Sequence, residues 1–173
     1  RVLFRSCIGG LAGDETPAQR RAALDVVIPV LADDPRPRYL MGLGSPVDLI
    51  EAVDAGVDMF DSVLPARVAR NGSLWVPDGR LNLRNARFQD DPRPVQEGCR
   101  CRLCRGFSRA YLAHLFRANE LLAYRLATCH NLTFLLDFMA GIRTAIADGT
   151  FPQLLRDVRA RADRPTVDTA VAS

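Results

Sequence analysis

The sequence contains no lysine, so all 23 of its basic side chains are arginines. It has no apolar run near the ~20 residues that a membrane-spanning helix needs, and we expect no membrane span. The first residues, RVLFRSCIGG, are too short and too interrupted an apolar stretch for a secretion signal. The 5 cysteines are odd in number and crowded, which argues against a disulfide framework. We therefore expect a cytoplasmic globular protein with one sizeable core.

Charge is unevenly distributed along the chain. Residues 1–65 hold 6 arginines and 10 acidic residues, whereas residues 66–125 hold 12 arginines and 5 acidic residues. Guanidinium groups bind phosphate well, so the basic middle segment favours a polyanionic partner. From charge alone, a solvated surface face explains the same segment equally well.

The first third of the chain alternates strand and helix signals. Apolar strands are expected at residues 2–8, 38–42 and 57–60. Thr16-Pro17 and Ser45-Pro46 each place a capping residue before proline, which predicts one helix to about residue 33, kinked at Pro29, and a second ending at Gly56. This order predicts parallel strands joined by crossovers. Three strands cannot close a barrel, so the sheet is either small and open or the back part of a larger one.

The rest of the chain has a different pattern. Residues 73–84 alternate around Pro77-Asp78-Gly79, which predicts a hairpin, and residues 85–107 are expected to be irregular. Apolar spacing predicts one helix over 109–127 and another from about 131 to 147. Residues 151–173 are expected to form a terminal helix and a disordered tail that starts at about residue 161.

Three of the cysteines fall within the six-residue stretch CRCRLC. Cys99, Cys101 and Cys104 have the spacing C-x-C-x2-C, and three thiolates in a tight loop need a fourth ligand to complete a tetrahedral zinc site. His130 lies 26 residues beyond the last of them, where it would fasten the loop to the helical segment. The pattern predicts a closed, structural zinc site rather than a catalytic one.

Other interpretations of the cluster remain open at the level of sequence. His114 follows the loop too soon to fold back easily, and Cys129 is a rival ligand beside His130. Three free thiols fit an arginine-rich polar loop poorly, because free cysteines are usually buried and scattered. A redox pair leaves the third cysteine unexplained and lacks a thioredoxin-like context.

A second informative stretch is GVDMFDSVLPARVARNG, residues 56–72. Asp61 stands where the third predicted strand ends, and chemistry gathers at the carboxyl ends of parallel strands. The other two strands end in the glycine-rich turns 9–10 and 42–44, where a ligand can approach the backbone. A helix cap or an ion pair explains Asp61 equally well. Asp58 competes for the role, but strand alternation puts it on the opposite face. Arg67 and Arg70, three residues apart, are placed to present two cations to phosphates.

These stretches together resemble the bacterial tRNA-guanine transglycosylase (queuine tRNA-ribosyltransferase) family. YLMGLGSPVDLIEAVDAGVDMFDSVLPARVARNG resembles the family's core signature, and IGGLAGDE is similar to its glycine-rich loop. CRCRLC, SRAYLAHLFRANELLAYRL and HNLTFLL resemble its zinc subdomain. The resemblance covers about residues 6–151.

The resemblance implies the C-terminal part of a (β/α)8 TIM barrel with a zinc-binding subdomain. It divides the chain into barrel units with the catalytic loop (1–72), a hairpin with the zinc-binding helices (73–150) and the terminal segment (151–173). The implied activity replaces guanine at the tRNA anticodon wobble position with a queuosine precursor base, through a covalent aspartate–ribose intermediate. The implied site residues are the nucleophile Asp61, the base-binding residues Gly10, Leu11 and Met41, the anticodon-loop contacts Arg67 and Arg70, and the zinc ligands Cys99, Cys101, Cys104 and His130.

Parts of the family's site have no counterpart in this sequence. The second catalytic aspartate and the residues that read the base edge lie earlier in the barrel, and Gly13-Asp14 replaces the usual Val-Gly of the substrate loop. We therefore expect an isolated chain to be inactive unless an N-terminal half is supplied, and the complete enzyme to be a homodimer. The alternative is a noncatalytic zinc-containing tRNA-binding or partner subunit. An archaeal-type relative is a weaker match, because such proteins usually carry further C-terminal domains.

Overall fold

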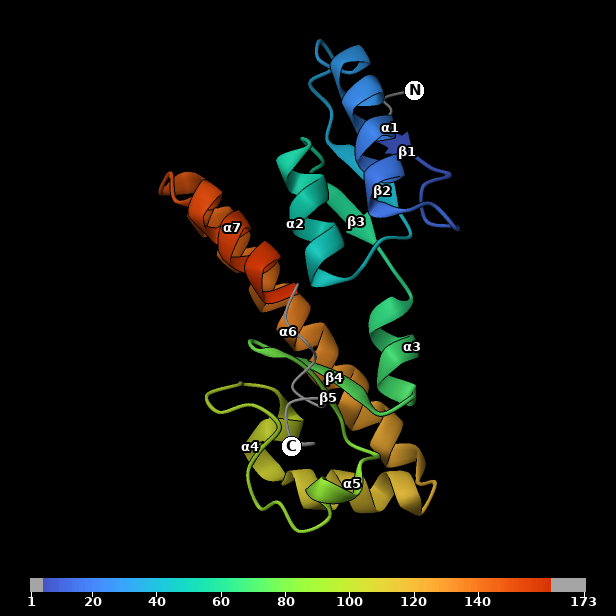
Figure 1. The fold of residues 1–173 in the computed structure, drawn as a ribbon, viewed down its shortest axis with the longest axis vertical. Helices are drawn as coiled ribbons and strands as arrows, with labels where there is room; N and C mark the ends of the chain where they lie inside the picture. Colours follow the sequence, from blue (N-terminus) through green and yellow to red (C-terminus); the bar gives the residue numbers. More distant parts are fainter. Residues whose placement is uncertain (1–4, 163–173) are drawn as a thin grey trace.

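The computed structural model describes residues 5–162, and its first part is an open three-stranded parallel sheet (Figure 1). The strands lie in the order β1-β2-β3, and the two connections are helical, as the sequence predicts. The sheet does not close, so the α/β class is confirmed, whereas a barrel is not formed by these residues alone. The elements are β1 (Ser6–Ile8), α1 (Pro17–Val30), β2 (Arg38–Met41), α2 (Pro46–Asp54) and β3 (Met59–Asp61).

Both crossover helices begin at the predicted capping residues. Thr16 accepts a hydrogen bond from the backbone of Gln19, whose side chain binds the Thr16 backbone in return. Ser45 accepts a hydrogen bond from the backbone of Asp48. α1 ends at Val30, three residues earlier than expected, and Pro29 lies inside its last turn.

The sheet and its helices enclose one hydrophobic cluster. Leu40, in the central strand, is fully buried, and Ile8 lies beside it in the register of β1 and β2. Burying such a side chain stabilises the fold by about 2 kcal/mol. The cluster therefore holds the carboxyl ends of the three strands at one edge.

The middle of the chain holds a hairpin and three short helical elements. The predicted hairpin is confirmed, and its strands pair from Ser73 with Asn82 to Val76 with Gly79. The helix that follows β3 was not predicted, and the segment expected to be irregular contains two short helical turns. These elements are α3 (Leu64–Arg70), β4 (Ser73–Val76), β5 (Gly79–Asn82), the 3-10 turn η1 (Ala86–Phe88) and α4 (Arg102–Gly106).

The predicted division of the next helices is wrong. α5 (Arg109–Arg117) ends two residues before Asn119, which has a left-handed φ of 56°, and α6 (Leu121–Ala147) continues without a break through residues 128–131. Asparagine adopts the left-handed conformation more readily than most residues, so it ends α5. The sequence predicts a helix start at Asn131, but the amide of this residue binds groups outside its own helix.

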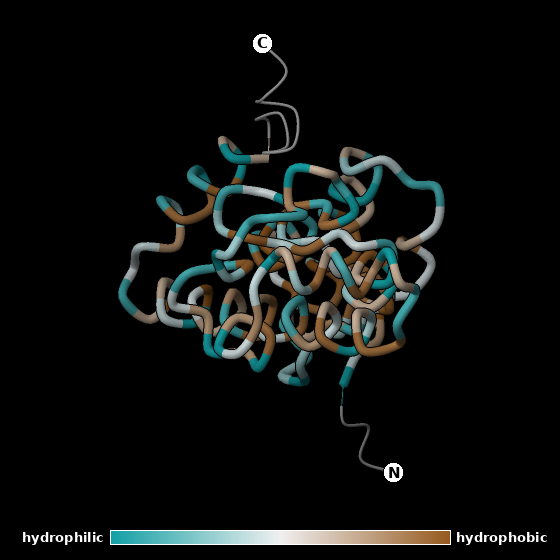
Figure 2. The backbone as a smooth tube through the Cα atoms, turned by 90° about the horizontal axis from the view of Figure 1, so that it is seen from below, coloured by the Kyte–Doolittle hydropathy of each residue, from teal (hydrophilic) through white to brown (hydrophobic). Residues whose placement is uncertain are grey.

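The long helix α6 connects the two parts of the molecule (Figure 1). Its first half packs in the largest core cluster, with the hairpin, α4 and α5, and its second half packs against α2 and α7 (Phe151–Ala162). In Figure 2 many hydrophobic segments lie in the interior of the molecule, while much of the outlying backbone is hydrophilic. The predicted disordered tail falls beyond the described residues, apart from residues 161 and 162, which belong to α7.

No helix within residues 5–162 combines the length and apolar character that a membrane crossing requires.

Candidate active site and metal centre

Three thiols and one imidazole converge between α4 and α6. Cys99, Cys101 and Cys104 lie in or beside the short helix α4, and His130 lies in the middle of α6, where it is fully buried. The four potential ligand atoms all lie within 4.8 Å of one another. The sulfur atoms are 3.8, 3.6 and 3.4 Å from His130 Nδ1.

The spacing of these atoms fits a tetrahedral zinc ion. Zinc lies about 2.3 Å from sulfur and about 2.0 Å from nitrogen, so tetrahedral ligands of these two kinds are about 3.5 Å apart. The sulfur–nitrogen distances of 3.4 to 3.8 Å bracket that value. The predicted ligand set is therefore brought together in a closed site. Neither His114 nor Cys129, both exposed, belongs to it.

The backbone of the hairpin orients the histidine. His130 Nε2 lies 2.7 Å from the carbonyl oxygen of Trp75. Because a carbonyl oxygen only accepts hydrogen bonds, Nε2 carries the ring proton and donates the hydrogen bond. Nδ1 is then left as a lone-pair donor that faces the three sulfur atoms. A hydrogen bond of this kind fixes the ring orientation and tautomer of metal-binding histidines.

The three thiols cannot all ionise together without a cation between them, because neighbouring thiolates repel one another. The Cys104 thiol donates to the sulfur of Cys101, which lowers the pKa of Cys101, while the same contact and burial raise the pKa of Cys104. Burial raises the pKa of Cys99. One thiolate therefore forms at the expense of the others, and a divalent cation in the centre is what allows all three to ionise.

Asn131, next to the histidine, ties three elements together. Its side chain is fully buried and donates to the carbonyl oxygens of Pro65 and Ser73, each at 3.1 Å. It also accepts a hydrogen bond from the backbone N–H of Trp75 at 3.1 Å. The amide thus fixes α6 to the start of α3 and to β4.

Asp61 lies at the carboxyl end of β3 and is exposed. Its Oδ1 accepts hydrogen bonds from the hydroxyl of Tyr39 at 2.7 Å and from the backbone N–H of Gly42 at 3.2 Å. The Tyr39 hydroxyl, and next the Gly42 amide, hold the pKa of the carboxyl below its ordinary value. The second oxygen, Oδ2, makes no hydrogen bond with residues 5–162, and so it is available to a ligand.

The carboxylate borders an open pocket at the carboxyl ends of the three strands. Gly10, Met41 and Asp61 line this pocket together, as the sequence led us to expect. Met41 lies directly opposite Asp61 in the parallel register and is 44% exposed, unusually high for a large apolar side chain in a sheet. Leu11 does not line the pocket with its side chain, which packs against the hydrophobic cluster of the sheet. Glu15 lines the pocket as well.

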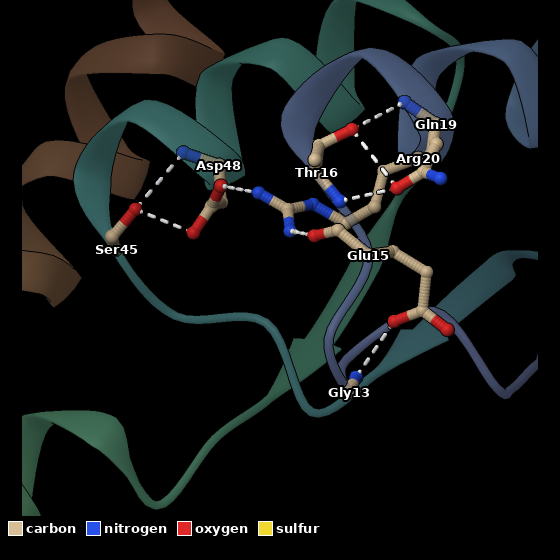
Figure 3. A network of polar contacts seen from close by, with 7 residues as sticks. All are labelled: Gly13, Glu15, Thr16, Gln19, Arg20, Ser45 and Asp48. Atoms are coloured by element: carbon tan, nitrogen blue, oxygen red, sulfur yellow. Dashed lines mark hydrogen bonds and ion pairs between the residues drawn. The ribbon is translucent and has the colours of Figure 1, made fainter.

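A polar network holds one wall of the pocket in place (Figure 3). Arg20 donates to the backbone carbonyl of Glu15 and to the carboxylate of Asp48, each at 2.6 Å. Asp48 also accepts a hydrogen bond from the hydroxyl of Ser45. The loop after β1 is thereby fixed to the start of α2, and so to the turn after β2.

Two glycines of that turn allow the loops to approach closely. Gly42 has a φ of +84°, and a Cβ atom there would lie 2.6 Å from the Cβ of Ala12. A Cβ atom at Gly44 would overlap the side chain of Ser62, the residue after Asp61. Both positions therefore need glycine, for steric reasons that involve neighbouring loops.

Arg67 and Arg70 lie on α3, one turn apart and both exposed. Neither guanidinium has an ion pair or hydrogen-bond partner within the described part of the chain. Asp58, the competitor of Asp61, lies at the opposite end of the strand pair, where it accepts a hydrogen bond from the Arg38 backbone. Asp58 therefore has a structural partner away from the pocket.

Sequence reasoning missed three residues of these sites. Tyr39 precedes Met41 by two positions in a strand, and the period of two would have placed both on the same face. Asn131 and the carbonyl of Trp75 have no comparable signal, because their partners lie 55 or more positions away in the chain.

Comparison with known proteins gives a consistent result. The family model described as queuine tRNA-ribosyltransferase matches residues 3–164. The queuine tRNA-ribosyltransferase of Symbiobacterium thermophilum is 55% identical over 146 residues, or 84% of this chain and 36% of the relative. Those of Nitratidesulfovibrio vulgaris and Zymomonas mobilis are 49% and 47% identical over 88% and 89% of this chain. The chain spans 36% to 40% of the length of these curated relatives.

Proposed function

The chain belongs to the queuine tRNA-ribosyltransferase family, and we propose that it supplies the nucleophile and the structural zinc centre for exchange of guanine at the tRNA wobble position. The exposed carboxylate of Asp61 carries this proposal. It stands at the carboxyl ends of parallel strands, is oriented by Tyr39, and borders the same pocket as both glycine turns.

The proposed chemistry is a double displacement at the ribose. An oxygen of Asp61 attacks C1′ while the bond from C1′ to the guanine nitrogen breaks, and the electron pair leaves with the base. The incoming base then attacks C1′ from the vacated side, and the ester bond to Asp61 breaks. A lowered pKa keeps the carboxylate ionised at neutral pH, which supports its role as the nucleophile.

The pocket residues suit a flat heterocycle. The exposed side chain of Met41 offers an apolar surface beside the reacting carboxylate, and Gly10 lines the same pocket. The backbone of Gly10 and of its neighbour Leu11 is proposed to bind the polar edge of the base. Arg67 and Arg70, which follow Asp61 in the chain, are proposed to bind phosphates of the anticodon loop.

Zinc has a structural part in this proposal. The ligands would be Cys99, Cys101, Cys104 and His130. Zinc would link the loop around α4 to α6 through coordination bonds to their thiolate and imidazole groups. The site is closed by four protein ligands, so no catalytic step is assigned to it.

Three further features belong to the proposal. The parallel strands are proposed to be part of a closed (β/α)8 barrel, because β1 and β3 leave unpaired edges within the described residues. The complete enzyme is proposed to be a homodimer that acts in the cytoplasm; all 5 cysteines are free, which agrees with a reducing compartment. Turnover is proposed to need the remainder of the barrel.

A test of the function uses trapping of the covalent tRNA intermediate in the complete enzyme. Wild-type protein should form an adduct that survives denaturing electrophoresis, and Asp61→Asn should abolish it while zinc content and melting temperature stay unchanged. Asp58→Asn, the matched control, should form normal amounts of adduct. Adduct formation by Asp61→Asn would remove this residue from its role. If the wild-type protein bound tRNA but formed no adduct, the result would favour a noncatalytic tRNA-binding subunit.

A further inference from the structure

An apolar groove lies where the hairpin, α6 and α7 meet, and it extends to the zinc loop, residues 99–104. Its volume is about 480 Å³, and most of its lining side chains are apolar, among them Trp75, Phe134 and Leu154. Of the four zinc ligands, all within the described residues, only Cys99 lines this groove. We propose that Cys99 is a modification site, at which organic hydroperoxides that enter the groove oxidise the metal centre.

The four ligands differ in how a reagent can reach them. His130 is fully buried and Cys101 is 4% exposed, whereas Cys99 is only partly buried and lies on the wall of the groove. Cys104 is partly buried as well, but it does not line the groove. A molecule that enters the groove therefore meets Cys99 before any other ligand.

The chemistry of the groove selects the class of reagent. Zinc binds cysteine as the thiolate, which is the form that peroxides oxidise. An apolar lining favours a hydroperoxide that carries a hydrocarbon group over hydrogen peroxide, because burying hydrocarbon surface is favourable. The sulfur atoms of Cys101 and Cys104 lie within 4.8 Å of the Cys99 sulfur, so a partner for a disulfide is close at hand.

The oxidation takes two steps. The Cys99 thiolate attacks the terminal oxygen of the hydroperoxide, the O–O bond breaks, and the alkoxide leaves and takes a proton from water. Cys99 has then been oxidised to a sulfenic acid, and the hydroperoxide has been reduced to an alcohol. The thiolate of Cys101 or Cys104 next attacks the Cys99 sulfur; a disulfide forms, the S–O bond breaks, and hydroxide leaves and is protonated to water. The disulfide removes two of the four ligands, so the site no longer holds zinc.

This modification acts on the metal centre and not directly on the pocket at Asp61. No residue of the described chain lines both the groove and that pocket. The inference therefore does not depend on the proposed function, and its readout is zinc content rather than turnover.

The test follows zinc release from the zinc-loaded 173-residue chain with a chromophoric chelator. Cumene hydroperoxide should release zinc at least about fivefold faster than hydrogen peroxide at the same concentration. Mass spectrometry should find Cys99 in the first disulfide that forms. Cys7 and Cys129, both exposed and outside the cluster, serve as internal controls and should be oxidised more slowly. Zinc added with dithiothreitol should restore one zinc per chain, because disulfide formation is reversible.

Two variants of α7 test the route into the groove. Ala162→Trp places a large side chain at a position that lines the groove, and it should slow zinc release by cumene hydroperoxide about threefold or more. Ala160→Trp, the matched control, is at an exposed position of the same helix that does not line the groove, and it should change the rate less than about twofold. Circular dichroism and the initial zinc content check that both variants are folded.

Three results would each overturn the proposal: equal rates for the two variants, release by hydrogen peroxide as fast as by cumene hydroperoxide, or a first disulfide that lacks Cys99. The reagent comparison and the mass spectrum use the unmodified sequence, so they decide the question even if a tryptophan variant does not bind zinc.

Discussion

The side-chain amide of Asn131 donates a hydrogen bond to the backbone carbonyl of Pro65, 3.1 Å away, although 66 positions separate them in the chain. Asn131 adjoins the zinc ligand His130, and Pro65 lies in the first turn of the helix that follows Asp61. The metal centre and the proposed catalytic loop are therefore joined through one buried side chain.

Replacing this amide should destabilise the protein. Asn131→Leu would leave three backbone groups without their partner, those of Pro65, Ser73 and Trp75. We expect the free energy of unfolding in urea to fall by about 2–4 kcal/mol, because each buried unpaired group costs about 1–3 kcal/mol. Leu132→Ala, at the exposed neighbouring position, should cost less than about 1 kcal/mol. An equal loss of unfolding free energy in the two variants would contradict the inference that Asn131 joins the metal centre to α3.

Loss of zinc should unfold the second part of the molecule. Cys101→Ser should abolish stoichiometric zinc, measured by mass spectrometry of the bound metal, because a tetrahedral site loses one of its four ligands. Structural zinc contributes on the order of 10 kcal/mol to small metal-dependent folds, so the melting temperature should fall by more than about 10 °C. Cys129→Ser removes an exposed thiol outside the cluster and should keep one zinc per chain. Full zinc in the Cys101 variant would show that the ligand set is wrong.

Removal of the tyrosine hydroxyl should change the titration of Asp61. The hydrogen bond from Tyr39 is the largest cause of the lowered pKa, so Tyr39→Phe should raise the pKa toward its ordinary value of 3.8. The sign follows from the charged state, which the hydrogen bond stabilises; without it, a proton binds at higher pH. In a pH profile of adduct formation by the complete enzyme, the acid limb should move to higher pH. Tyr124→Phe, remote from β3, should leave the limb in place, and a shift to lower pH in the Tyr39 variant would contradict the assignment.

A methyl group at Gly44 should displace Ser62, the residue after the proposed nucleophile Asp61. A Cβ atom there overlaps the Cβ and Oγ atoms of Ser62, and the Ser62 Cβ atom cannot move unless the backbone moves. Gly44→Ala should therefore destabilise the protein by about 1–3 kcal/mol in urea unfolding and slow adduct formation at least ~10-fold. Gly141→Ala is the control, because a Cβ atom at this exposed position of α6 would point into open space, and it should be neutral or stabilise by up to about 1 kcal/mol. Normal adduct formation by Gly44→Ala would show that the approach of the two loops is not needed.

The sequence by itself was sufficient for features that depend on neighbours in the chain. The cap at Thr16, the hairpin around Asp78 and the spacing of the three clustered cysteines each depend on a few consecutive residues. Parallel strands and the strand-end position of Asp61 followed from the order of elements. Local geometry decides these features, and periodicity and residue type report it directly.

Only the tertiary structure decided which groups satisfy one another across the fold. The break between α5 and α6 was misplaced because Asn131 looks like a cap in sequence, whereas its amide binds backbone groups of α3 and β4. The Tyr39 hydroxyl reaches Asp61 from the next strand, and the Trp75 carbonyl sets the tautomer of His130. Buried polar groups take whichever partner the packing of distant segments brings within reach, and chain order does not encode that distance.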